Sequence, residues 1–134
     1  MSAGFPHSRD FFPPAPALEL GLRAPDGDKL RAPLSGIIDT GADITMVPLV
    51  VLEEIAAPVI DEVQLRSHWG DITTVTTYLV DIELGTDLFP AIEVVGDLHS
   101  DTVLLGRNVI NKLLLLVDGL QQTTDILARR PQTP

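Results

Sequence analysis

Short stretches of alternating hydrophobic and polar residues run along most of this chain, separated by residues that favour turns. Alternation with a period of two is typical of half-buried β-strands, so these stretches predict strands. The predicted strands are 18–22, 34–38, 63–65, 72–78, 78–84, 89–95, 103–105 and 113–117. Segments 48–55 and 108–112 suit two short helices. Many short strands, two small helices and frequent turns predict a mainly β barrel or sandwich-like domain.

The chain is expected to hold one domain between two proline-bearing ends. Its 134 residues are typical of a single domain. Residues 1–17 are interpreted as a proline-rich N-terminal arm, 18–128 as the folded domain and 129–134 as a flexible tail. Because aromatic residues make up only 4% of the chain, the core must be aliphatic. The leucine run 113–116 is assigned to that core.

The charge balance argues against nucleic acid and anionic membranes as partners. Nine Lys and Arg face nineteen Asp and Glu, which gives a net charge of −10. Binding to a phosphate backbone depends on cations that displace condensed counterions, and such a surface would repel the phosphates instead. No apolar stretch is long enough to cross a bilayer and no signal peptide is visible, so a cytoplasmic protein is expected.

The composition also gives little support to a metal or cofactor. The chain has no cysteine, which excludes disulfides, thiolate zinc sites and a cysteine nucleophile. It has three scattered histidines, so a histidine metal site is poorly supported. No cofactor and no metal are expected.

One short motif, Asp39-Thr40-Gly41-Ala42, lies where the apolar strand 34–38 stops. Glycine lets the backbone turn tightly and lets amides approach a carboxylate. A carboxylate held in this way is oriented to act as a general acid or base. The same residues also suit a simple turn that Asp39 caps. The four residues alone leave both interpretations open.

The wider sequence resembles the retropepsin-like aspartic proteases, a family of single-domain, retroviral-type enzymes. Within that family it resembles the bacterial-type homologues. Three segments carry the resemblance, in the family's order: Gly36 to Asp43, Ser67 to Gly70, and Leu104 to Ile110. It covers about residues 18–120. The resemblance implies a closed β-barrel of the retropepsin-like acid protease type with one or two short helices.

The resemblance assigns roles to the first segment. Asp39 matches the catalytic aspartate, one per subunit, and Gly41 the glycine beside it and the incoming substrate. Thr40 matches the residue whose hydroxyl bonds across a dimer axis. Ala42 and Asp43 match positions in the substrate cleft.

The third segment supports the first. Leu105, Gly106 and Arg107 match the element packed beneath the catalytic loop. In the family, the arginine matched by Arg107 commonly pairs with the acid matched by Asp43. The resemblance therefore implies an ion pair here, which either braces the loop or lies beside substrate. Ile44 stands where some retroviral relatives carry a second acid, which favours apolar substrate side chains.

The second segment matches the tip of a flap that closes over substrate. Gly70 is the residue that permits the hinge, and His68 and Trp69 are its bulky neighbours. Trp69 is expected either to contact substrate or to pack onto the barrel. His68 is assigned to the substrate side with Trp69, although a solvent-facing polar role fits it as well.

Only one Asp-Thr-Gly occurs, so a dyad requires a second copy of the chain. The resemblance therefore implies a homodimeric aspartic endopeptidase whose substrate is a peptide or protein. Retroviral proteases interleave terminal strands between subunits, whereas the proline-rich arm here suggests another assembly or flexible extensions. The alternative is a non-catalytic dimerisation or peptide-binding domain that kept the barrel, with a metal-dependent hydrolase as a distant third.

Overall fold

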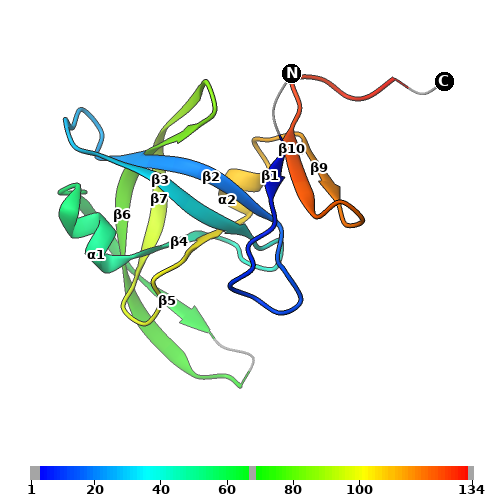
Figure 1. The fold of residues 1–134 in the computed structure, drawn as a ribbon. Coiled ribbons are helices and arrows are strands. Elements are labelled where there is room, and N and C mark those ends of the chain that lie inside the picture. Colours follow the sequence, from blue (N-terminus) through cyan, green and yellow to red (C-terminus); the bar gives the residue numbers. More distant parts are fainter. Residues whose placement is uncertain (1–3, 67–68, 133–134) are drawn as a thin grey trace.

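The computed structural model describes residues 4–66 and 69–132, and its strands form two sheets (Figure 1). The strands are β1 (Phe5–Pro6), β2 (Ala17–Arg23), β3 (Leu30–Ile38), β4 (Thr45–Pro48), β5 (Val59–Arg66), β6 (Ile72–Leu84), β7 (Asp87–Asp97), β8 (Val103–Leu105), β9 (Leu115–Asp118) and β10 (Thr123–Ile126). The helices are α1 (Leu49–Glu54) and α2 (Arg107–Ile110). None of the helices in these ranges is long and apolar enough to cross a membrane.

The larger sheet closes on itself. Its strand order is β2-β3-β8-β4-β7-β6-β5, and β2 also pairs with β6. That extra pairing, Gly21 with Glu83 and Arg23 with Asp81, joins the two sides into a ring of six strands. β5 pairs only with β6 and lies outside the ring. The prediction of a mainly β, closed barrel with two short helices is confirmed.

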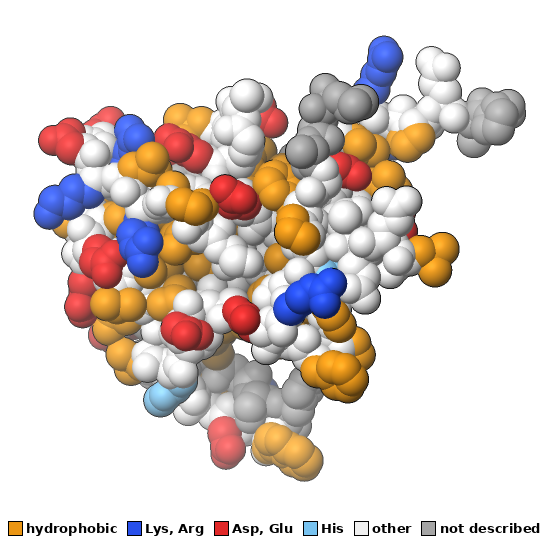
Figure 2. Space-filling view, viewed as in Figure 1, with side chains coloured by type: hydrophobic (Ala, Val, Ile, Leu, Met, Phe, Trp, Pro, Cys, Tyr) orange, Lys and Arg blue, Asp and Glu red, His pale blue; other side chains and the backbone are white. Residues whose placement is uncertain are grey.

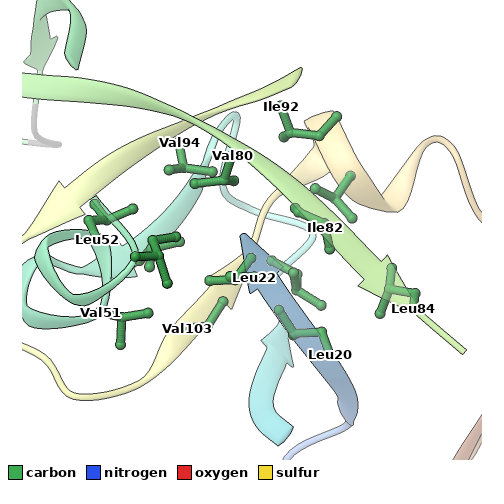
Figure 3. Packing of buried hydrophobic residues seen from close by; sticks show 14 of the residues in the cluster. Leu20, Leu22, Val51, Leu52, Val80, Ile82, Leu84, Ile92, Val94 and Val103 are labelled. Carbon is green, nitrogen blue, oxygen red and sulfur yellow. The ribbon is translucent and has the colours of Figure 1, made fainter. Parts of the chain in front are cut away.

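An aliphatic core fills the ring, as expected from the scarcity of aromatic residues (Figure 3). Alternate residues of β6, namely Val80, Ile82 and Leu84, point inward and are almost fully buried. They pack with leucines of β2 and with Leu52 of α1. Each such side chain contributes about 1.5–3 kcal/mol through burial.

The smaller sheet has the order β1-β10-β9. β1 pairs with β10 of the same chain, Phe5 opposite Thr124, and Phe5 packs partly against the core. A turn that follows Asp118 joins β9 to β10, and Asp118 Oδ1 accepts hydrogen bonds from the backbone N–H groups of Leu120 and Gln121, both at 3.0 Å. β1 and β10, which lie far apart in the sequence, therefore pair in one sheet beside the barrel.

The assignment of the leucine run 113–116 to the core was wrong in part. Leu113 and Leu115 pack partly against the core, but Leu116 is 46% exposed. The strand begins only at Leu115, and Val117, predicted as part of a buried strand, is also 46% exposed. The physical reason is that β9 belongs to the outer sheet and not to the closed ring, so only some of its side chains reach the core.

Candidate active site

The loop that carries the Asp-Thr-Gly motif joins β3 to β4 and lies against β8. β3 and β8 run parallel, with Ile38 opposite Leu105. The backbone N–H of Asp39 continues this pairing and donates to the carbonyl oxygen of Leu105 at 3.0 Å. The first and third segments singled out in the sequence are therefore brought together in the fold.

Backbone groups of its own loop hold the Asp39 carboxylate. The N–H of Gly41 donates to Asp39 Oδ1 at 3.0 Å, and the N–H of Ala42 donates to the carbonyl oxygen of Asp39 at 3.2 Å. A Cβ at Gly41 would lie 3.3 Å from the same Oδ1, so glycine keeps this approach open. Asp39 is half-buried, while Thr40 and Gly41 are exposed. Asp39 therefore caps a turn that also orients its carboxylate, and its catalytic role stays a prediction.

Arg107 holds the other side of the loop. Its backbone N–H donates to the carbonyl oxygen of Ala42 at 2.8 Å, and its Nη1 donates to that of Thr40 at 2.8 Å. Its Nη2 forms an ion pair with Asp43. Because the Asp43 side chain is 86% exposed, this pair contributes at most about 1 kcal/mol. In this geometry Arg107 braces the loop.

Beneath the loop lies a polar network that sequence reasoning missed. Thr45 is fully buried, and its hydroxyl donates to Asn108 Oδ1 at 2.8 Å and accepts from the N–H of Gly106 at 3.0 Å. Asn108 Nδ2 donates in turn to the carbonyl oxygen of Glu93 in β7 at 2.8 Å. Asn108 lies within the segment Leu104 to Ile110, but the sequence assigns it no role of its own. The one available signal for Thr45 was a hydroxyl residue at the start of an apolar stretch.

Gly106 lies in close contact with the loop. A Cβ there would lie 2.5 Å from the carbonyl carbon of Ile44 and 2.9 Å from the backbone nitrogen of Thr45. Such distances do not occur in real structures, so any side chain at this position would push the loop away. Leu105, Gly106 and Arg107 together form the floor on which the Asp39 loop rests.

The expected flap is the hairpin of β5 and β6, which projects away from the ring (Figure 1). Trp69 at its tip is 89% exposed, and Gly70 has a φ of +86°, a left-handed conformation that favours glycine. Ser67 and His68 fall outside the described residues, so the expectation for His68 stays a prediction. Trp69 and Gly70 lie between β5 and β6, and their role in a flap stays a prediction.

A groove of about 280 Å³ lies between this hairpin and the barrel. Its apolar lining includes Met46 at the start of β4, Val75 and Tyr78 of β6, and Val95 of β7. Asp97 and His99 are polar members of the lining. Met46 lies two residues after Ile44, which is the last residue of the Asp39 loop. The groove is therefore next to the candidate catalytic loop along the chain.

No group of three or more His, Asp or Glu side chains among residues 4–66 and 69–132 is arranged to hold a metal ion. Acidic side chains are instead spread over the visible face of the molecule, with a few basic ones between them (Figure 2).

Comparison with known proteins links this geometry to one fold. No protein-family model and no curated protein sequence matches the chain. Among solved structures, a retropepsin-like aspartic protease from Rickettsia conorii is similar with a TM-score of 0.60 and 13% identity, over 91% of this chain and 87% of that one. A foamy viral protease–reverse transcriptase is similar with a TM-score of 0.50 and 24% identity, over 71% of this chain. The match spans only 15% of the foamy viral protein. The chain thus has the closed β-barrel fold of the retropepsin-like aspartic proteases.

Proposed function

We propose that this protein is an aspartic endopeptidase of the bacterial retropepsin-like type, active as a homodimer. The observation that carries the proposal is the held carboxylate of Asp39. In a retropepsin-like fold, it lies at the end of β3, on a loop fixed by Leu105 and by the N–H of Gly41. A carboxylate in that position suits acid–base chemistry on a peptide bond.

The reaction needs two such carboxylates that share one proton, because two like charges at close range cannot both ionise cheaply. The ionised Asp39 takes a proton from a water molecule, whose oxygen adds to the peptide carbonyl carbon. The protonated Asp39 of the other copy hydrogen-bonds the carbonyl oxygen as negative charge develops there. When the carbon–nitrogen bond breaks, a proton passes to the leaving nitrogen, and the dyad again holds one proton.

The second carboxylate comes from a second chain, since each chain has one Asp-Thr-Gly. Both copies of Asp39 then lie at a two-fold axis, which gives one active site per dimer. The exposed Thr40 follows Asp39 directly and is available to bond across that axis. Each chain thus supplies one of the two carboxylates of the proposed active site.

The substrate class we propose is an extended peptide segment with apolar side chains. The groove beneath the β5–β6 hairpin has an apolar lining from Met46, Val75 and Val95. Ile44 extends this apolar character along the loop that carries Asp39. Trp69 and Gly70, at the hairpin tip, would close over the bound peptide and exclude water.

Replacement of Asp39 tests the mechanism. Asp39→Asn keeps the shape of the side chain but removes its acid–base function, so cleavage of an unfolded protein should fall by about 100- to 10,000-fold. The matched control is Asp26→Asn, in an exposed turn with a φ of 59° that asparagine tolerates, and it should cleave normally.

The assay should run from about pH 4 to 7, near the ordinary range in which carboxylates titrate, with and without pepstatin. Undiminished cleavage by Asp39→Asn would exclude the mechanism. A folded dimer that cleaves nothing under any of these conditions would support the alternative, a non-catalytic dimerisation or peptide-binding domain.

A further inference from the structure

The outer face of β2 carries a pattern that packing of the barrel does not require. The leucines of β2 point into the core. Because residues of a strand point alternately to its two faces, the alternate residues Ala17, Glu19 and Gly21 lie on the outer face. One charged side chain therefore stands between a methyl group and a position without any side chain.

This pattern leaves a hollow on each side of Glu19. The first hollow has a volume of about 260 Å³ and is lined by Ala17 and by Pro6 of β1. The second has a volume of about 230 Å³ and is lined by Gly21 and by Ala32 of β3. Three residues line both hollows, namely Phe5, Glu19 and Pro33. We call the two hollows together the β2 groove, and β1 lies against β2 beside it (Figure 1).

Carboxylate oxygens are available in the β2 groove. Among residues 4–66 and 69–132, the exposed side chain of Glu19 has neither a hydrogen bond nor an ion pair. Glu83, which lines the second hollow, has its Oε1 3.4 Å from Arg23 Nη2. Its Oε2 is 3.5 Å from the point where a Cβ at Gly21 would lie, so this oxygen stands over the floor of the second hollow.

The combination of apolar walls and carboxylates suits the side chain of arginine or lysine. Such a side chain buries its aliphatic stem on apolar surface while its cationic head reaches a carboxylate. A guanidinium also stacks on aromatic faces and pairs with a carboxylate through two N–H groups. Phe5 supplies an aromatic side chain in both hollows, next to Glu19.

The spacing of the acids matches an extended peptide. The Glu83 oxygen stands over Gly21, which is two residues after Glu19 in β2, or about 6.6 Å along the strand. Alternate side chains of an extended peptide point to the same side and repeat at the same distance. Two basic side chains at alternate positions therefore reach one carboxylate each.

We propose that the β2 groove binds an extended segment of a partner protein with basic residues at alternate positions, in the pattern Arg-x-Arg. The first basic side chain fills the hollow over Ala17 and pairs with Glu19. The second fills the hollow over Gly21 and pairs with Glu83. The net charge of −10 attracts such a cationic segment at long range.

The inference goes beyond the proposed function and does not depend on it. The β2 groove shares no lining residue with the groove beneath the β5–β6 hairpin. None of its lining residues belongs to the Asp39 loop or to the floor formed by Leu105, Gly106 and Arg107. Binding at this face therefore leaves the candidate active site open.

Fluorescence anisotropy with a labelled, capped peptide, Ala-Arg-Ala-Arg-Ala, tests the proposal. The peptide should bind saturably, and an increase in ionic strength should weaken the binding because ion pairs carry it. Ala-Arg-Arg-Ala-Ala has the same charge, but its adjacent arginines point to opposite sides of an extended chain. It should bind about two- to fivefold more weakly, which corresponds to the loss of one exposed ion pair.

Three variants of the protein test the site itself. Glu19→Lys replaces attraction by repulsion and should abolish measurable binding. Ala32→Leu adds apolar volume at an exposed position of the second hollow without a change in charge, and it should weaken binding several-fold. The matched control is Glu53→Gln, at an exposed position of α1, which should bind the peptide like the wild type. All three should unfold at the wild-type urea concentration.

The location of binding is measured separately. In proton–nitrogen correlation spectra, the peptide should shift the amide signals of Glu19, Gly21 and Ser35. Pepstatin should not displace it. Displacement by pepstatin, or signal shifts confined to the β5–β6 hairpin, would place the peptide in the candidate active site and overturn the proposal.

The remaining outcomes decide the proposal as well. Equal binding by Glu19→Lys and the wild type, or no saturation at about 1 mM protein, would overturn it. A change in the dimer dissociation constant of Glu19→Lys would show that a second copy of the chain covers the groove, and the partner segment would be excluded. If the peptide binds as expected and no substrate is cleaved, the β2 groove stands while the protease fails.

Discussion

Gly106 and Thr45 illustrate how closely the candidate site is packed at the level of single residues. The backbone of Gly106 lies against Ile44 and Thr45 with no room for a Cβ, and the Thr45 hydroxyl bonds to its N–H. The buried amide of Asn108 completes the contact by bonding to Thr45 and to β7. Because buried polar groups are costly when left unpaired, these three residues depend on one another.

Replacement of Gly106 should therefore be severe. Gly106→Ala would force the loop backbone to move, and overpacking of this kind typically costs about 1–3 kcal/mol of unfolding free energy. Urea denaturation should show this loss, and peptide cleavage should fall with it because the Asp39 loop shifts. The matched control is Gly119→Ala, where a Cβ would meet nothing within 4 Å. Equal stability of the two variants would contradict the role given to Gly106.

At this scale the sequence predicts motif residues better than their partners. The glycine in Leu105-Gly106-Arg107 could be recognised from its neighbours along the chain. The bond from Thr45 to Asn108 joins residues 63 positions apart, and no local pattern records such a contact. Hydrogen-bond partners of this kind become visible only when the barrel is closed.

The strands and helices divide into a closed ring and a projecting hairpin. Most strand positions were predictable because alternation is a local property. The exposure of β9 was not predictable from the sequence, because a run of leucines is typical of a core. Its position at the edge of the outer sheet depends on strand pairing, which no local pattern records. The length of β6, predicted as two adjoining stretches, also exceeds its local signal, because it pairs with β5 along one part and with β2 and β7 along another.

Amide hydrogen exchange should distinguish the ring from the hairpin. Nearly all residues of β5 are exposed, and the strand pairs with β6 alone, so local opening should cost little. We expect the amides of 61–66 to exchange much faster than those of Val80 to Leu84, which lie in the buried part of β6. Equal protection of the two segments, measured by mass spectrometry, would show that the hairpin is as rigid as the barrel.

At the scale of the whole molecule, two features act against each other. The proposed active site requires two copies of the chain, yet each copy carries a net charge of −10. Two such molecules repel each other at long range, and short-range contacts at the interface must overcome that repulsion. Dimerisation should therefore depend on the salt concentration.

Salt should strengthen the dimer. Raising the ionic strength from about 0.01 M to about 0.15 M shortens the Debye length from about 30 Å to about 8 Å and screens the repulsion. We expect a lower dimer dissociation constant in sedimentation velocity and a higher activity per chain at a fixed, dilute concentration. At either salt level, activity per chain should fall on dilution below that constant. Dimerisation that weakens with salt would indicate that ion pairs dominate the interface.

The parallel pairing of β3 with β8 has a consequence for how the protein folds. It joins Gly36–Ile38 to Val103–Leu105, segments far apart in the chain, and the N–H of Asp39 bonds to Leu105 at the end of that pairing. Contacts across such long loops form slowly because the chain entropy must be lost first. Asp39 consequently reaches its final position only after residues on both sides of the chain have met. We therefore expect the Asp39 loop to take its final position late in folding, after β3 and β8 have paired.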